Sequence, residues 1–406
     1  MPVALFATLD TKGTEAGFLR DRLVALGVSV RLVDTGCLDE PGMAPDVPRD
    51  DVFAAAGTST RALQDDGDRG AAVTAAAAGA AALAARWAAA GELEGVIGLG
   101  GSAGTTIATA AMRALPLGVP KVMVSTLASG QVRPWVGDSD VMMLNSIVDI
   151  SGLNRISRSV LDSAARAMAG LVTLSPAPAS SDDRRLVAAT MFGVTTPCVE
   201  RARRRLEEAG FEVLVFHATG NGGQAMEALI ADGLISGVLD ITTTELADEL
   251  VGGILSAGPD RLTAAGREGV PQVISVGATD MVNFGPRDDI PPRFADRLFY
   301  EHNPTVTLMR TTVEENRRQG REIAEKAAAS TGLTTLMLPL CGVSAIDCAD
   351  QPFDDPEARD ALFTAIRDHH GTAELLELPH HVNDPEFADA TATRLIELIN
   401  RQGELS

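Results

Sequence analysis

The chain has 406 residues, which is enough for two or three ordinary domains. Its 34 basic and 55 acidic residues give a formal net charge of −21, and because nucleic acid binding needs a basic face, we expect no nucleic acid partner. The four cysteines contain no CxxC pair, which argues against a zinc site. The amino terminus lacks the pattern of a signal peptide, and the Ala-rich stretch 71–90 is poor in large apolar residues. We therefore expect a cytoplasmic protein with no membrane contact.

The chain opens with a unit that is repeated later. Residues 7–36 predict an apolar strand, a polar bend, an amphipathic helix and a second strand that ends in Thr-Gly, and residues 189–220 repeat this order. Gly27 and Gly210 are placed to end the two helices. The apolar faces of these helices share one register: Ala16, Leu19, Leu23 and Leu26 in the first, and Val199, Ala202, Leu206 and Ala209 in the second.

Three further pieces follow in the same order in each half. The pieces 95–105, 119–130 and 144–155 match 237–247, 270–281 and 308–318, and the last pair places Asn154 opposite Asn316. The stretch 174–183 is rich in Pro, Ser and Asp and predicts a linker. Residues 331–402 predict strand, helix, strand and helix with no counterpart in the first half.

Strands that alternate with helices are typical of parallel sheets covered on both faces. We therefore predict an α/β fold of two duplicated Rossmann-like, doubly wound domains around a cleft. The predicted domains are 1–178, which binds a nucleotide, and 179–406, whose last helix is left free to pack on either domain. Chance similarity between α/β segments is the alternative to duplication.

The sequence GVIGLGGSAGT at 95–105 is the strongest candidate for a ligand site. Glycines after a strand let the backbone approach a ligand, and free N–H groups at the start of the next helix favour an anion. The stretch lacks the Lys-Ser/Thr of a P-loop and the full GxGxxG spacing, so a bare strand-to-helix turn is the alternative. The residues that we assign to a phosphate here are Gly100, Gly101, Ser102, Gly104, Thr105 and Thr106.

Two charged residues near neighbouring strand ends complete a hypothetical nucleotide site. Lys12 follows the first strand in a bend before Glu15 and could meet a phosphate, although it could equally be a solvated loop lysine. Asp34 ends the second strand, where a carboxylate can bind ribose or can cap a turn. The same strand ends contribute the remaining predicted contacts to the cofactor, Asp10, Gly13, Gly36, Ser125 and Thr126.

The second copy replaces the glycines with DITTTELADE at 240–249, so the phosphate interpretation fails there. Its strand ends carry polar groups suited to a second, small polar or acidic ligand, and their oxygens could also hold Mg²⁺. Helix capping is the alternative for each of these residues. The glycines at 220–223 could form a second anion site or a simple bend. The predicted contacts to the second ligand are His217, Gly222, Asp240, Thr243, Glu245, Asp280, Asn283, His302, Arg310 and Glu314.

Several long motifs resemble the ATP-binding amino-terminal domain of the tomato mosaic virus resistance protein and its bacterial relatives. They include TLDTKGTE, GLGGSAGT, FHATGNGGQAME, DITTTELAD and HNPTVTLMRTTVEEN, and the resemblance spans almost the whole chain. It implies two Rossmann-like subdomains and ATP binding. It also implies a TIM-barrel partner, which in this family is often fused or encoded nearby and which we expect here to be a separate protein.

These observations predict a cytoplasmic, Mg²⁺-dependent ATP-binding protein. The triphosphate would lie on the glycine loop of the first domain, and phosphoryl or adenylyl transfer is the natural reaction class if the protein is an enzyme. The alternative is a non-enzymatic sensor whose two lobes close on a small molecule. A two-thiol racemase is disfavoured because Cys37 and Cys198 fall in different matched pieces. We also expect a homo-oligomer.

Overall fold

The computed structural model describes residues 1–37, 39–174 and 184–405. The chain divides into two compact units, Met1–Ala179 and Ser180–Ser406. Except for Leu174, the predicted linker 174–183 lies outside the described residues.

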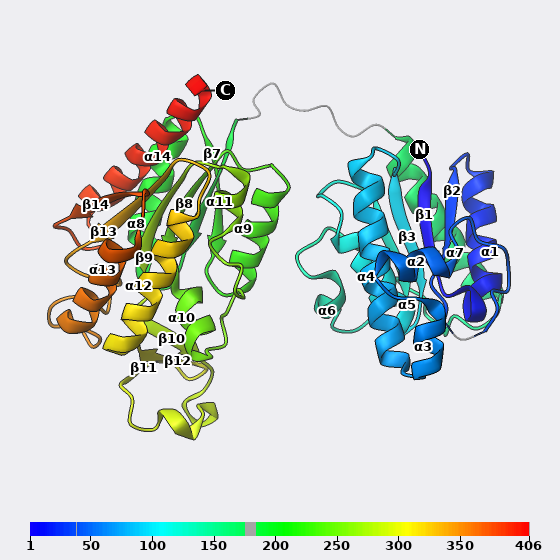
Figure 1. The fold of residues 1–406 in the computed structure, drawn as a ribbon, viewed down its shortest axis with the longest axis horizontal. Helices are drawn as coiled ribbons and strands as arrows, with labels where there is room; N and C mark the ends of the chain where they lie inside the picture. The colour runs from blue at the N-terminus through cyan, green and yellow to red at the C-terminus, as the bar shows by residue number, and fades with distance from the viewer. Residues whose placement is uncertain (38, 175–183, 406) are drawn as a thin grey trace. The chain divides into compact units, whose positions relative to one another are not determined.

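The first unit is a parallel sheet of five strands in the order β2-β1-β3-β4-β5, with helices on both faces (Figure 1). Its strands are β1 (Val3–Ala7), β2 (Val30–Asp34), β3 (Gly95–Gly100), β4 (Lys121–Ser125) and β5 (Met142–Asn145). Its helices are α1 (Leu9–Ala25), α2 (Arg49–Ala55), α3 (Thr60–Asp66), α4 (Arg69–Ala89), α5 (Ser102–Arg113), α6 (Arg133–Val136) and α7 (Arg155–Thr173).

Strand β1 lies inside the sheet, between β2 and β3, and every one of its residues is buried. Val3 and Leu5 point to the face covered by α1 and α7, while Ala4 and Phe6 point to the face covered by α2, α4 and α5. This alternation explains why the strand is a continuous apolar run: both of its faces belong to a core.

Helix α4 is the one helix within the described residues that is long and apolar enough to cross a membrane by length and composition. Its largest apolar side chains do not face outward: Leu83 and Trp87 are buried in the core between α4 and the sheet. The pattern is that of a core helix packed on a sheet.

The predicted helix faces and helix ends are confirmed in both copies. Gly27 and Gly210 have φ of 83° and 91° directly after α1 and α8 (Thr196–Glu208), a conformation that glycine adopts without strain. The first three apolar residues of each predicted face are buried, whereas Leu26 is half-buried and Ala209 is exposed, because the helices end there.

The second unit has a parallel sheet of six strands in the order β14-β13-β9-β8-β6-β7 and a small antiparallel sheet in the order β10-β12-β11. Its strands are β6 (Leu186–Met191), β7 (Glu212–His217), β8 (Gly237–Thr242), β9 (Gln272–Gly277), β10 (Met281–Phe284), β11 (Phe299–Asn303), β12 (Val306–Arg310), β13 (Thr334–Pro339) and β14 (Glu374–Leu378). Besides α8, its α-helices are α9 (Asn221–Ala231), α10 (Thr244–Val251), α11 (Ala264–Glu268), α12 (Val313–Ala328), α13 (Pro356–His369) and α14 (Pro385–Leu405).

The two units confirm the duplicated Rossmann-like fold, and the strand order corrects one matched pair. The piece 144–155 contains β5 of the parallel sheet, whereas 308–318 contains β12 of the antiparallel sheet. Asn154 caps α7, but Asn316 lies inside α12, which Thr312 caps. Sequence similarity misled here because both pieces end in a polar helix start.

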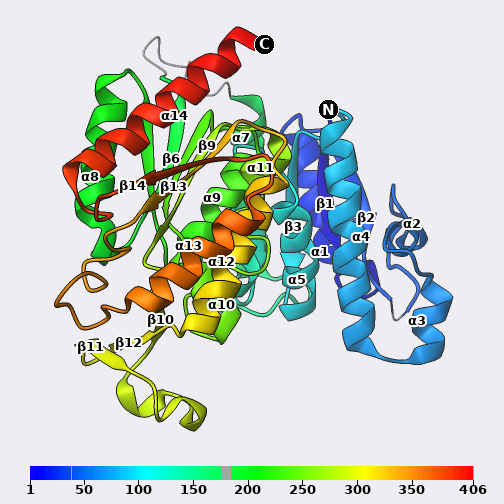
Figure 2. The same ribbon diagram turned by 60° about the vertical axis from the view of Figure 1, so that its left-hand side comes forward.

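Residues 331–402, which were expected to have no counterpart in the first half, contain the true counterparts of β5 and α7. Strand β13 lies beside β9 as β5 lies beside β4, and α14 packs against α8 as α7 packs against α1 (Figure 2). Leu395 and Leu398 of α14 join the core of the second unit, so the described part of the last helix packs within that unit.

We expect Gly79→Ala to lower the stability of the first unit. A Cβ atom on Gly79 of α4 would lie 1.9 Å from the carbonyl oxygen of Val52 in α2, so the two helices must separate. Gly170→Ala in α7 is the matched control, because a Cβ there meets nothing within 4 Å and should stabilise the helix by about 1 kcal/mol. Urea unfolding followed by tryptophan fluorescence measures this unit, since both tryptophans, Trp87 and Trp135, lie in it. Equal effects of the two substitutions would contradict the packing argument.

Candidate functional site

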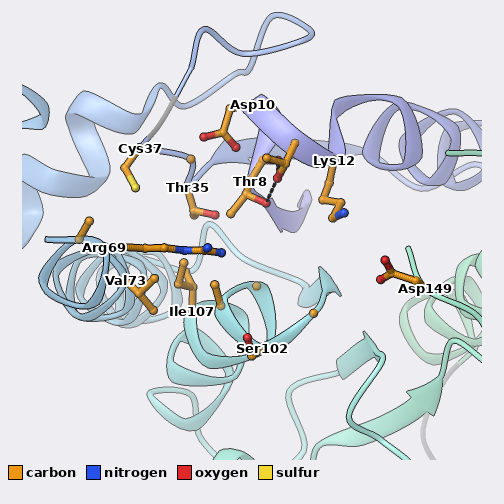
Figure 3. Close-up of a pocket in the computed structure, with 16 residues that line it drawn as sticks. Thr8, Asp10, Lys12, Thr35, Cys37, Arg69, Val73, Ser102, Ile107 and Asp149 are labelled. Atoms are coloured by element: carbon orange, nitrogen blue, oxygen red, sulfur yellow. Dashed lines mark hydrogen bonds between the residues drawn. The ribbon is translucent and has the colours of Figure 1, made fainter. Parts of the chain in front are cut away.

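A cavity of about 250 Å³ lies at the carboxyl ends of β1, β2 and β3 (Figure 3). The strand order reverses between β1 and β3, and ligands of open α/β sheets bind at such a reversal. The cavity is lined by residues that follow these strands, by the first turns of α4 and α5, and by the loop after β5: Thr8, Asp10, Thr11, Lys12, Thr35, Gly36, Cys37, Arg69, Ala72, Val73, Gly101, Ser102, Ala103, Gly104, Ile107 and Asp149.

The first turn of α5 contributes free backbone N–H groups to the cavity wall. Gly101 is the N-cap of this helix and supplies no side-chain acceptor. Thr105 donates its N–H to the Gly101 carbonyl at 2.8 Å, and in the described part of the chain no acceptor is found for the N–H groups of Ser102, Ala103 and Gly104. A helix of this length carries partial positive charge at its N-terminus, so this wall of the cavity suits an anion.

The glycines between β3 and α5 have different structural roles. A Cβ atom on Gly104 would lie 2.9 Å from the Leu99 carbonyl oxygen, and one on Gly100 would lie 2.9 Å from the Cα of Gly104. These two glycines therefore let α5 pack closely on β3. A Cβ atom on Gly101 would meet only the Thr126 hydroxyl oxygen, at 3.7 Å, so the lack of a side chain there leaves the cavity open.

Lys12 lines the cavity and also ties two of its walls together. Helix α1 begins at Leu9, earlier than predicted, and the backbone leaves helical geometry at Lys12. The Lys12 ammonium donates a hydrogen bond to the carbonyl of Ile150 in the loop after β5. A second link joins the same elements, from the Gly152 N–H to Glu15 Oε1 at 2.5 Å. Lys12 is therefore a fixed cation rather than a solvated loop lysine.

Two charged residues of the cavity were not found from the sequence. Arg69 reaches into the cavity from the start of α4, and Asp149 lies on the side of Lys12 (Figure 3). No hydrogen bond or ion pair of either side chain is found among the residues that the structure describes. Asp149 stands at a predicted strand end, so its position was a usable signal, whereas nothing local marks Arg69 as different from other helix-start arginines.

Six of the predicted cofactor contacts line the cavity and seven do not. Those that line it are Asp10, Lys12, Gly36, Gly101, Ser102 and Gly104, and those that do not are Gly13, Asp34, Gly100, Thr105, Thr106, Ser125 and Thr126.

Asp34 has a structural role instead of facing the cavity. Its buried carboxylate accepts hydrogen bonds from the N–H groups of Leu9 and Gly36 and pairs with Arg49 at 2.7 Å. All of these contacts hold the ends of β1 and β2 together.

The hydroxyl groups that miss the cavity are likewise bonded within the protein. Thr105 and Ser125 are buried and share a hydrogen bond of 2.7 Å. Thr106 accepts a hydrogen bond from the Trp135 indole at 3.1 Å. Their hydrogen bonds hold the start of α5 in place.

In the second unit, two of the groups assigned to a second ligand, Asp240 and Glu245, form an internal ion network. Arg261 is buried and makes two hydrogen bonds to Asp240, of 2.5 and 2.7 Å, and one to Glu245, of 2.6 Å. Thr190 donates to Asp240 at 2.7 Å. The sequence reasoning missed Arg261 because it is 16 residues from Glu245 and stands in no motif.

Glu245 takes the place that an external anion would take in the second unit. One of its carboxylate oxygens accepts the N–H groups of Gly220 and Gly223, at 2.7 and 3.1 Å, in the first turn of α9. A Cβ atom on Gly223 would lie 2.4 Å from this carboxylate. The possible second anion site at 220–223 is therefore filled by the protein's own carboxylate.

The remaining predicted contacts of the second unit form no single site, although Asp280 and Arg310 lie together, with Arg310 donating to the Asp280 carbonyl at 3.2 Å. Asp280 accepts from the Ser344 hydroxyl, Arg310 pairs with Asp347, and the Asn283 amide donates to Asp248, all in buried positions. The others share no site: the Thr243 hydroxyl donates to the Ser275 carbonyl, Glu314 pairs with Arg317, a Cβ atom on Gly222 would clash with the His217 carbonyl, and His217 and His302 are exposed.

Cys37 and Cys198 have the electrostatics of unreactive thiols. Burial raises the pKa of Cys198 to about 12. Burial and the neighbouring Asp10 raise the pKa of Cys37 at the cavity wall. A nucleophilic cysteine needs a lowered pKa, so neither thiol favours covalent catalysis.

Comparison with known families covers both units. A model described as "Uncharacterised protein family (UPF0261) N-terminal domain" matches residues 1–177, and the C-terminal domain of the same family matches residues 184–399. A UPF0261 protein of Clostridium tetani is 47% identical over 98% of this chain and 99% of its own length.

A second relative comes from a plant. The ToMV resistance protein Tm-1(GCR237) of Solanum lycopersicum is 46% identical over 76% of this chain. The aligned region covers 42% of the length of that protein. Among solved structures, a Listeria monocytogenes protein aligns with 100% of this chain and 97% of its own at 12% identity and a TM-score of 0.22, which is too low to support an argument.

We expect the second unit to lose stability as the pH rises toward 7. Burial, with the Asp347 carboxylate, raises the pKa of Asp280 to about 7 from an ordinary 3.8, and burial raises the pKa of Asp248 to about 7. Between pH 3.8 and about pH 7 the folded unit binds more protons than the unfolded chain, so the free energy of unfolding falls as the pH rises.

Asp280→Asn, which mimics the protonated group, should make this slope shallower. The measurement is hydrogen exchange of second-unit peptides across pH 5 to 8, corrected for intrinsic exchange rates. Asp21→Asn, at an exposed site in the first unit, is the control. A slope that Asp280→Asn leaves unchanged would contradict the assignment.

Proposed function

The chain belongs to the uncharacterised protein family UPF0261, and for this member we propose that the first unit binds ATP, with Mg²⁺, in the cavity at the carboxyl ends of β1, β2 and β3. The observation that carries the proposal is the start of α5, where N–H groups without an acceptor in the described residues face a cavity that Lys12 and Arg69 also line.

The charge around the cavity supports a phosphate chain. The chain as a whole carries a formal charge of −21, which repels anions, so an anion needs a local concentration of donors. Lys12, Arg69 and the first turn of α5 supply two cations and a helix N-terminus around one cavity. Backbone N–H groups and cations arranged in this way are the usual means of binding phosphates.

ATP is our choice among phosphate compounds because of the family resemblance. The motifs that resemble the ATP-binding domain of the tomato resistance protein include TLDTKGTE and GLGGSAGT, and both contribute residues to the cavity. The relationship to that protein extends over 76% of this chain.

Mg²⁺ fits the same cavity through its carboxylates. Asp149 and Asp10 line the cavity. Within the described residues no group of three or more His, Cys, Asp or Glu side chains could hold a metal ion. Mg²⁺ in nucleotide sites usually needs only one or two carboxylates, because the phosphates and water supply its other ligands.

The proposal covers binding and leaves the reaction to measurement. Asp240, Glu245 and Arg310 were among the groups assigned to a second ligand, and each is engaged in a buried ion pair. ATP consumption by the full chain would indicate phosphoryl or adenylyl transfer, whereas saturable binding without product would favour a sensor.

We expect Ala103→Asp and Arg69→Ala each to raise the dissociation constant for ATP at least about tenfold. The new carboxylate would stand at the phosphate end of α5, where it stabilises the helix but repels an anion. Arg166→Ala on α7 removes the same charge as Arg69→Ala from an exposed position outside the cavity and is the control. Isothermal titration of the full chain measures the constants. Unchanged affinity in both cavity variants would refute the site.

We expect Asp149→Asn to weaken binding of Mg²⁺–ATP by about tenfold and to leave or improve binding of metal-free ATP. The substitution removes a metal ligand and also a negative charge that repels the phosphates. Titrations with Mg²⁺ and with a chelator separate the two effects. Asp162→Asn on α7 is the matched control, because that carboxylate pairs with Arg22 away from the cavity. Parallel losses with and without metal would contradict a metal role.

A further inference from the structure

A second hollow, of about 370 Å³, adjoins the phosphate cavity on the side of β2. It is lined by Cys37, Leu63, Gln64, Gly67, Asp68, Arg69 and Ala72. Cys37, Arg69 and Ala72 line both spaces. The two hollows are therefore neighbours with a shared wall, and we call the pair the groove.

The two parts of the groove differ in chemistry. The phosphate cavity holds Lys12 and the start of α5. The second hollow has the half-buried side chain of Leu63 and the buried Ala72 as apolar walls. Its carboxylate, Asp68, caps α4 by accepting the N–H groups of Gly70 and Ala71 at 2.7 and 3.2 Å. Arg69 lies between the two hollows and lines both. In the second hollow, Leu63 and Ala72 offer an apolar surface to an uncharged, flat group, and the Asp68 carboxylate repels a phosphate.

Gln64 gives the hollow a group that can recognise a polar ring edge. Its side-chain amide is exposed and donates to the Cys37 carbonyl at 3.4 Å, which is long for such a bond and easily exchanged for a ligand. A primary amide offers both a donor and an acceptor, which matches the paired donor and acceptor on the edge of a purine or pyrimidine.

The order of the groups along the groove matches a nucleotide. The cavity proposed for the phosphates lies where the strand order reverses, between β1 and β3. Thr35 and Gly36 follow β2, and the second hollow lies beyond them, at α3 and the start of α4. A sugar placed at Thr35–Gly36 would join phosphates at α5 to a base at Leu63.

We propose that the hollow between α3 and α4 is the nucleobase subsite of this protein, with Leu63 and Ala72 against the ring and Gln64 on its edge. The inference rests on the proposed nucleotide binding in the first unit. It adds that the base, and not only the phosphate chain, contributes to affinity, and that α3 is the element that selects it.

The test compares ATP with inorganic tripolyphosphate, which has the phosphates but no base. Full-length wild type and variants are titrated with each compound by calorimetry. Leu63→Ser and Gln64→Ala should each weaken ATP binding, the first by roughly tenfold because an apolar contact is lost, and leave tripolyphosphate binding unchanged. Ala103→Asp should weaken both compounds. Leu26→Ser, at a half-buried leucine directly after α1 and outside both hollows, should weaken neither.

Each failure has a distinct meaning. If Leu63→Ser and Gln64→Ala bind ATP as wild type does while Ala103→Asp does not, the base subsite is refuted and the phosphate site stands. Equal loss of ATP and tripolyphosphate in Leu63→Ser and Gln64→Ala also refutes the subsite. If wild type binds neither compound, the proposed function itself is refuted. The exposed Gln64 serves as the second variant, since its truncation leaves the core intact, and tryptophan fluorescence verifies that each variant is folded.

Discussion

Backbone N–H groups at the start of a helix need an acceptor, and a parallel α/β sheet brings several helix starts to one edge. Two helix starts, one in each unit and after non-equivalent strands, meet this need differently. In the second unit Glu245 accepts the N–H groups of Gly220 and Gly223 at the start of α9. In the first unit the described residues provide no side-chain acceptor at the start of α5, and those N–H groups line a cavity. The start of α9 is thus closed by a carboxylate of the protein, whereas the start of α5 can receive an anion. Helix α10, the counterpart of α5, likewise has no side-chain cap.

The Glu245 carboxylate that accepts the N–H groups of α9 is buried, so its negative charge needs a buried cation. A buried carboxylate is costly unless it is paired and hydrogen-bonded. Arg261 meets this condition by bonding to Asp240 and Glu245 together, and Thr190 supplies a further donor to Asp240. The network joins β6, β8, α10 and the segment before α11. The same strand order therefore supports an internally bonded edge in one copy and an open edge in the other.

The open edge of the first unit is nevertheless well held. Lys12 and Glu15 of α1 bond to the loop after β5 through Ile150 and Gly152. Asp34 and Arg49 fix the segment after β2 from beneath. These bonds lie around and below the cavity, so the N–H groups of α5 and the side chain of Arg69 face it without being used by the fold. A binding site of this kind is organised before its ligand arrives, which lowers the entropy cost of binding.

The sequence by itself determined the local features: the buried faces of α1 and α8, their glycine ends, and the strand–glycine–helix order at 95–105. Those features depend on spacing along a few turns of chain. It also indicated the duplication and six of the sixteen residues that line the cavity, because the ends of parallel strands must share an edge. Only the tertiary structure decided which polar residues face the cavity. In the sequence Asp34 and Glu245 resemble ligand groups, but in the structure they form ion pairs with Arg49 and Arg261. The places of Arg69 at the cavity and of β13 in the sheet also depend on the fold. Charge pairing and strand order are set by residues far apart in the chain, and no local pattern encodes them.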